Sequence, residues 1–151
     1  GQILKGAKRK PRPTLTGIVI DDAEATFRGT WTKSNAAGSL SGSSYHHDAG
    51  RERGNKSVSF TRSIEASGRY DVRLLYSAHE NRATNAPIVL AIGDELHDLQ
   101  MNQRLPNVVD GKARSLGVFT IEQGMEVNLT LFNRGADGIV SVDGLQLVLV
   151  E

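Results

Sequence analysis

The chain has 151 residues, of which 38% are hydrophobic and 23% charged, with a net charge of +1 and no cysteine. This length and composition are typical of one globular domain with a hydrophobic core of its own. The lack of cysteine excludes thiol catalysis, disulfides and thiolate metal sites, and no apolar run approaches the roughly 18 residues that span a bilayer, so we expect no membrane insertion.

The first segment, residues 1–16, differs in charge from the rest. Five of the 18 basic residues and none of the 17 acidic ones lie before Pro13. A basic stretch that ends in prolines predicts a linker or tail. The alternative is an arm that binds nucleic acid, but the remaining chain has 13 basic and 17 acidic residues and no basic stripe. We therefore expect no nucleic-acid partner.

From residue 17 onward the hydrophobic pattern has a period of two. Tyr70, Val72 and Leu74, for example, alternate with Asp71 and Arg73. Such alternation places one side of a strand on a core and the other toward solvent. The pattern predicts ten strands, at 17–21, 25–31, 57–62, 69–77, 87–92, 95–101, 113–120, 125–132, 138–142 and 144–150.

Glycine-containing turns separate these strands, and no stretch after residue 17 has a helical stripe. Parallel strands need crossover connections, which are usually helices, so the sheets are expected to be antiparallel. The pattern predicts an all-β fold over residues 17–151, an antiparallel β-sandwich of jelly-roll-like form. Two long connections remain, 32–55 and 102–112, and connections of this length are often functional.

The first long connection begins after Trp31 and contains the sequence YHHD, Tyr45 to Asp48, near its end. The Trp31 ring either stacks on a sugar or closes one end of the core. His47 and Asp48 either contact a ligand or bind the loop backbone. A zinc site formed with His79 has no support, because no HxH or HExxH spacing is present.

The segment SAHENRATNAP gathers polar groups between two apolar runs. Asn81 and Asn85 either stabilise a turn or donate hydrogen bonds to a ligand. The planar fork of Arg82 suits a carboxylate or a pair of vicinal hydroxyls. Its alternative partner is an internal carboxylate, such as Asp48 or Asp137.

Several signatures of catalysis and cofactor binding are missing. The sequence has no GxSxG, no GxGxxG and no Walker A loop, which argues against a nucleophile elbow and against nucleotide binding. A calcium site from Asp137 and Asp143 has weak support, because there is no DxDxDG loop. We expect no catalytic residues, no metal and no cofactor.

Four pieces of the sequence together resemble the golvesin / xanthan lyase C-terminal carbohydrate-binding-like domain over residues 18–150. They are NRATN at 81–85, the aromatic-x-His-Asp piece at 45–48, SLG.F at 115–119, and the ending DG…VDG..L. The sequence departs from the pattern at His46, where an aliphatic residue is common.

The resemblance implies a β-sandwich appended to larger exported bacterial proteins, among them polysaccharide lyases and FAD-dependent oxidoreductase-like chains. It implies an accessory module without catalytic activity that lies outside the cytoplasm, periplasmic or secreted. The expected partner is a polysaccharide. The alternative is an interdomain or assembly domain that docks on the parent catalytic domain, which the low aromatic content of 5% favours.

The residues expected to contact a ligand come from the two polar segments and from Trp31. In the alternative, the same residues form a buried polar network that fixes the loops. The predicted set is Trp31, Tyr45, His47, Asp48, Asn81, Arg82 and Asn85.

Overall fold

The computed structural model describes residues 16–34, 45–51, 54–107 and 113–150. The predicted linker, except for Thr16, and parts of both long connections lie outside these ranges. The described residues form twelve strands: β1 (Ile18–Asp21), β2 (Thr26–Arg28), β3 (Thr32–Ser34), β4 (Tyr45–His47), β5 (Ser57–Ser63), β6 (Gly68–Leu75), β7 (Ala86–Ile92), β8 (Glu95–Met101), β9 (Arg114–Ile121), β10 (Glu126–Phe132), β11 (Ser141–Val142) and β12 (Gly144–Val150).

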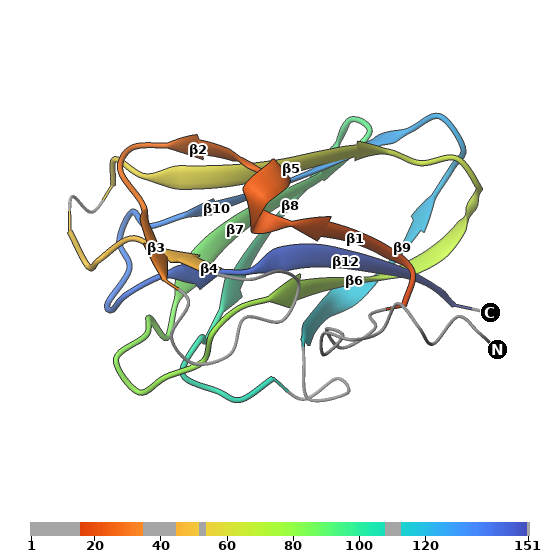
Figure 1. Ribbon diagram of the computed structural model, residues 1–151. Coiled ribbons are helices and arrows are strands. Elements are labelled where there is room, and N and C mark those ends of the chain that lie inside the picture. The colour runs from red at the N-terminus through yellow and green to blue at the C-terminus, as the bar shows by residue number, and fades with distance from the viewer. Residues whose placement is uncertain (1–15, 35–44, 52–53, 108–112, 151) are drawn as a thin grey trace, which may run out of the picture.

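The strands form two main sheets and one small sheet (Figure 1). The first main sheet has the order β1-β12-β6-β9, and the second has the order β2-β5-β10-β7-β8. The small sheet has the order β11-β4-β3. All pairs of named strands are antiparallel, and the helical residues within the described ranges are a single 3-10 turn, Asp22–Glu24. The predicted all-β antiparallel sandwich is confirmed.

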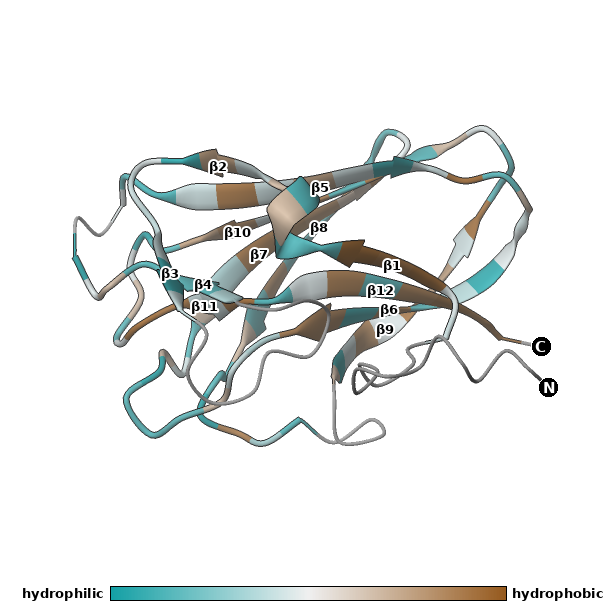
Figure 2. Ribbon diagram, viewed as in Figure 1, coloured by the Kyte–Doolittle hydropathy of each residue, from teal (hydrophilic) through white to brown (hydrophobic). Residues whose placement is uncertain are grey.

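The hydrophobic core lies between the two main sheets. Val72 and Leu74 of β6 and Leu129 and Leu131 of β10 have no exposed surface, and they belong to one apolar cluster. Apolar and polar bands alternate along several strands in Figure 2. Because side chains on a strand alternate between its two faces, the apolar residues that recur at every second position form one buried face on each sheet.

The SLG piece of the sequence forms a β-bulge. The pairing of β6 with β9 shifts between Val72, which lies opposite Gly117, and Arg73, which lies opposite Ser115. Leu116 is the extra residue, and Gly117 adopts a φ of 130°, a conformation that side chains rarely allow. The bulge therefore explains why glycine follows leucine here.

The structure differs from the predicted strands in the connection 32–55. The segment is predicted to be a loop, but it contains β3 and β4, which pair with each other, and β4 also pairs with β11. β3 and β4 have three residues each and β11 has two, which is too few for an alternation of apolar and polar residues to be recognised. Two predicted strands are shorter than expected, since 25–31 contains only β2 and 138–142 contains only β11.

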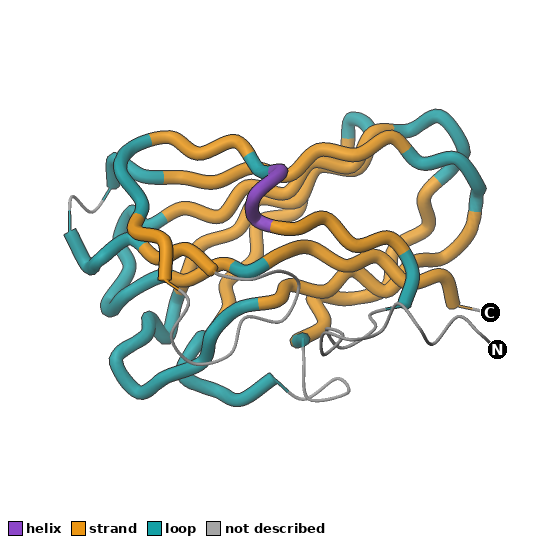
Figure 3. The backbone as a smooth tube through the Cα atoms, viewed as in Figure 1, coloured by secondary structure: helices purple, strands orange, loops and turns teal. Residues whose placement is uncertain are grey.

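Loops gather at the two ends of the sandwich, with the strands between them (Figure 3). At one end, the turn after β4 meets the chain that leads to β11, because the Asp48 amide donates to the Val140 carbonyl at 3.0 Å. The connection between β6 and β7 joins them there, through an isolated bridge between Arg82 and Ile139. This end brings together the two polar segments singled out in the sequence.

Candidate functional site

The meeting of the three loops depends on a close approach of two backbones. The Ile139 amide donates to the Asn81 carbonyl at 3.0 Å, and the Ala83 amide donates to the Ile139 carbonyl at 2.8 Å. A Cβ atom on Gly138 would lie 2.5 Å from the Arg82 carbonyl oxygen. Glycine is therefore required at this position, and the DG pair of the sequence has a steric cause.

Asp48 is the centre of this end of the molecule and is completely buried. Its Oδ1 accepts hydrogen bonds from the amides of Gly50 and Val140, both at 2.9 Å. Its Oδ2 accepts from Asn133 Nδ2 at 3.1 Å. The carboxylate thus joins its own turn to the chain that leads to β11.

Asn133 extends the same network and is also completely buried. Its Oδ1 accepts from the Gly54 amide at 3.0 Å and from the Lys56 amide at 3.1 Å. The Lys56 ammonium turns inward and donates to the Asp48 carbonyl at 2.8 Å. Asn133, which directly follows β10, is thus the partner of Asp48.

Arg82 lies next to this network and is only 6% exposed. Its Nε donates to the Ser77 carbonyl at 2.8 Å, and its Nη1 donates to Asn81 Oδ1 at 2.7 Å. Its Nη2 donates to the Tyr45 hydroxyl at 3.3 Å, and the guanidinium lies 5.8 Å from the centre of the Tyr45 ring. The side chain therefore braces the loop after β6 against β4.

The suggested internal carboxylate partners of Arg82 are wrong. Asp48 is bound to Asn133 and to backbone amides. Asp137 accepts from the amide of Thr84 at 2.6 Å and also from the Thr84 hydroxyl. Among the described residues, the acceptors that the guanidinium binds are all neutral oxygens, one from the backbone and three from side chains.

Asp137 and Asn85 hold the loop after β6 to the turn after β10. The Asp137 amide donates to Asn85 Oδ1, and Asn85 Nδ2 donates to the Gly135 carbonyl, both at 3.0 Å. The bonds from Thr84 hold the pKa of Asp137 below its ordinary value. This ladder accounts for the NRATN and GADG pieces of the sequence as loop-stabilising groups.

His47 and Trp31 are both half-buried. His47 Nδ1 accepts from the Ala49 amide at 3.1 Å, which leaves the proton of the neutral ring on Nε2. Burial, and then the charge of Arg82, lower the pKa of His47. Trp31 Nε1 donates to the Arg28 carbonyl at 3.1 Å, and its ring packs edge-on against Phe27.

The structure thus brings six of the predicted ligand contacts to one end of the sandwich and places Trp31 beside Phe27 on the core. Tyr45, Asp48 and Arg82 are buried, whereas Asn81 is exposed and Asn85 half-buried. Their role in binding a ligand stays a prediction.

A second polar cluster escaped the sequence analysis. Asp21, Asp22 and Asp143 bring carboxylate oxygens within 4.8 Å of one another. Carboxylate oxygens are the ligands that hard divalent cations prefer. Among the described residues, this is therefore the group that could hold a metal ion. The VIDD and VDG pieces contain all three residues, but their approach depends on the pairing of β1 with β12.

His46, the residue at which the sequence departs from the family pattern, contacts this cluster. Its Nδ1 lies 2.6 Å from Asp22 Oδ2, and Asp22 is 1% exposed. Burial and the nearby carboxylates of Asp21 and Asp143 raise the pKa of Asp22 to about 8, and burial lowers the pKa of His46. A hydrogen bond at this distance requires one proton between the carboxyl group and the ring.

The raised pKa of Asp22 makes stability fall as pH rises. Above about pH 4 the unfolded chain loses a proton that the folded state retains, so this contribution is fully present below that pH and is lost as pH rises through about 8. From about pH 5 to about pH 8, we expect the free energy of unfolding of Asp22→Asn to rise by about 3 kcal/mol relative to that of the original chain.

Urea unfolding of both proteins at the two pH values measures this change. EDTA is included because a bound cation would hold the carboxylates ionised. Because His46 contacts Asp22, the same comparison in a His46→Gln background separates the two titrations. An equal stability difference at the two pH values would contradict the raised pKa.

Known proteins match nearly the whole length of this chain. The family described as Golvesin C-terminal domain matches residues 18–149. A xanthan lyase from Bacillus sp. (strain GL1) is 27% identical over 99% of this chain, but the match covers only 16% of that enzyme. The chain therefore spans about one sixth of the length of this curated relative.

Solved structures agree with the fold. The structure of Paenibacillus xanthan lyase superposes with a TM-score of 0.79 and 32% identity, over 88% of this chain and 13% of that one. A family 35 carbohydrate binding module from Clostridium thermocellum superposes with a TM-score of 0.64 and 16% identity, over 90% of this chain and 100% of that one. At this identity the second match establishes the fold alone.

Proposed function

The chain belongs to the golvesin C-terminal domain family, and from this premise we propose that it is a non-catalytic accessory module that binds polysaccharide within a larger exported bacterial protein. The family implies attachment to a catalytic region, such as that of a polysaccharide lyase. The proposal includes a location outside the cytoplasm. None of the helices in the described ranges is long and apolar enough to cross a membrane.

The observation that carries the proposal is the superposition with a family 35 carbohydrate binding module over the whole of its solved chain. A second match supports the accessory role, because the region equivalent to this chain is 13% of Paenibacillus xanthan lyase. Function does not follow from fold alone, so the proposal also needs groups that face solvent.

Two predicted residues retain such groups. Asn81 is exposed, and Arg82 occupies only its carbonyl oxygen Oδ1. His47 keeps the N–H on Nε2, since Nδ1 is occupied by the Ala49 amide. We propose that these two residues and the second amide N–H of Asn85 donate hydrogen bonds to sugar hydroxyls, and that the Trp31 ring stacks on a sugar. Tyr45, Asp48 and Arg82 hold the loops in place.

The second candidate function is docking on a parent catalytic domain. The burial of Tyr45, Asp48 and Arg82 favours it, because side chains that brace a loop have no free groups for a ligand. It differs from the first in its partner, which is a protein surface. A chain that binds no polysaccharide but associates with its parent catalytic domain would establish this function.

The experiment is a titration of the 151-residue chain against neutral and acidic polysaccharides by calorimetry and affinity electrophoresis. We expect at least one polysaccharide to bind, and the variant His47→Ala/Asn81→Ala to bind it more weakly by about tenfold. Ser63→Ala/Thr120→Ala, which changes two exposed residues outside this end, is the control. Absence of binding to every polysaccharide at millimolar sugar would refute the proposal.

A further inference from the structure

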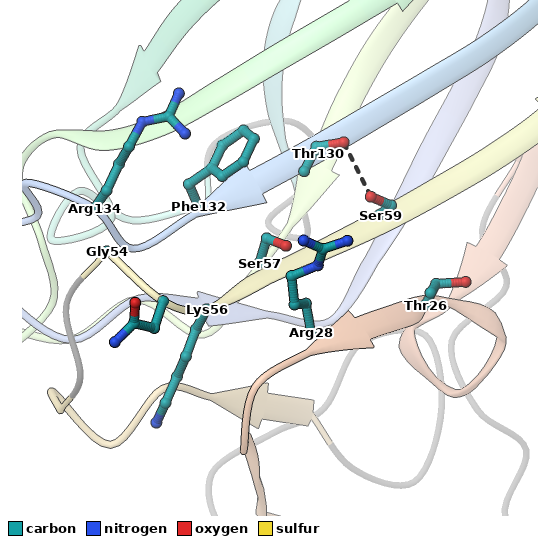
Figure 4. A pocket seen from close by; sticks show the side chains of 10 residues that line it. Thr26, Arg28, Gly54, Lys56, Ser57, Ser59, Thr130, Phe132 and Arg134 are labelled. Carbon is teal, nitrogen blue, oxygen red and sulfur yellow. Dashed lines mark hydrogen bonds between the residues drawn. The ribbon is translucent and has the colours of Figure 1, made fainter.

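The outer face of the second main sheet carries a hollow of about 420 Å³ (Figure 4). It lies over β2, β5 and β10. Val58 and Phe60 alternate with Ser57 and Ser59 along β5 and are buried in the core, so the two serines face outward. The hollow thus follows from the same alternation that built the sandwich.

The pairing of the strands arranges the lining residues in two rows. Thr26 lies opposite Ser59, and Ser59 lies opposite Thr130, so the first row consists of three hydroxyls. The hydroxyls of Ser59 and Thr130 are 3.0 Å apart. Neighbouring residues on one face of a strand are about 7 Å apart, which is the distance between the two rows.

The second row contains the charge. Arg28 lies opposite Ser57, and Ser57 lies opposite Phe132. Arg134, in the turn after β10, places its guanidinium 4.0 Å from the centre of the Phe132 ring. Figure 4 shows Arg28 and Arg134 on opposite sides of Ser57. The aromatic ring therefore acts as a platform for one of the two cations.

These two cations are available to an anion. Both side chains are exposed, and neither guanidinium forms a hydrogen bond or ion pair with any residue that the structure describes. None of the lining residues that the structure describes is acidic. Lys56 also lines the hollow, but its ammonium turns into the interior toward the Asp48 carbonyl.

We propose that this face binds the carboxylate groups of an acidic polysaccharide, with Arg28 and Arg134 as the recognising cations. A guanidinium binds a carboxylate through two parallel N–H donors, and the adjacent hydroxyl row suits the hydroxyls of a sugar. Two cations do not form the long basic stripe that nucleic acid requires. The inference rests on the proposed function, since it names the class of polysaccharide and adds a site away from the loop end.

The test uses a matched pair of ligands and a matched pair of variants. Polygalacturonate and its highly methyl-esterified form share a backbone and differ in carboxylate charge. The variant Arg28→Gln/Arg134→Gln is compared with Arg62→Gln/Arg69→Gln, which removes the same charge from residues outside the hollow. Circular dichroism melts confirm that all proteins are folded.

We expect the face variant to bind polygalacturonate about tenfold more weakly or worse, and the control variant to lose less than about threefold. The esterified polymer should bind the original chain weakly, and the face variant should bind it equally. Equal losses in the two variants, or no loss in the face variant, would overturn the assignment.

Two further outcomes are informative. The assignment to a glycan would be overturned if single-stranded DNA bound as tightly as polygalacturonate and the face variant lost this binding. Binding of neutral polysaccharides alone, weakened by His47→Ala/Asn81→Ala, would overturn this inference and leave the proposed function standing. Absence of binding to any polysaccharide would refute both.

Discussion

Asp48→Asn is expected to lower the free energy of unfolding by about 3–5 kcal/mol. The new amide nitrogen would face Asn133 Nδ2, and the two donors would lie 3.1 Å apart. Asn133 cannot turn its amide over, because its Oδ1 already accepts from the Gly54 and Lys56 amides. A buried donor without an acceptor costs its desolvation energy, and such a loss is a large fraction of the stability of a domain.

Exchanging the two residues offers a matched control. In Asp48→Asn/Asn133→Asp, the amide at position 48 can donate to the carboxylate at position 133, and that carboxylate can still accept from the Gly54 and Lys56 amides. We expect the double variant to be more stable than either single variant, although it loses the bond from Asn133 to the Arg51 carbonyl. Urea unfolding of the four proteins forms a double-mutant cycle. Additive losses would show that the pair does not act as a unit.

Arg82→Ala is expected to lower the free energy of unfolding by about 2–3 kcal/mol. The change removes the bonds to Ser77, Asn81 and the Tyr45 hydroxyl, and it empties the volume of a side chain that is only 6% exposed. The loss is smaller than for a buried ion pair, because no carboxylate among the described residues is left without its partner. Thermal and urea unfolding measure this loss.

Two controls separate bracing from ligand contact. Arg82→Met should recover about 1 kcal/mol, since it refills the volume and leaves no charge to desolvate. Arg69→Ala removes an exposed arginine of β6 and should change stability by less than about 0.5 kcal/mol. An unchanged melting temperature in Arg82→Ala, with polysaccharide binding lost, would instead assign Arg82 to the ligand.

The sequence also indicated which segments form the candidate site, but not how their side chains are used. It singled out 45–48 and 81–85, and the structure places both at one end of the sandwich. It suggested a carboxylate partner for Arg82, and this was wrong. The partner of a buried group depends on which backbone and side-chain oxygens the folded loops turn toward it, and the spacing of residues along the chain does not encode that direction.

The antiparallel sandwich was determined by the sequence itself, because alternation of apolar residues along β5, β6, β10 and β12 allows only one face of each sheet to be buried. The tertiary structure alone decided the contacts between segments far apart in the chain. The Asp48–Asn133 pair, the group of Asp21, Asp22 and Asp143, and the row of Arg28, Ser57 and Phe132 all depend on strand register. Register is set by the packing of the whole core and by the turns together, so no local pattern predicts it.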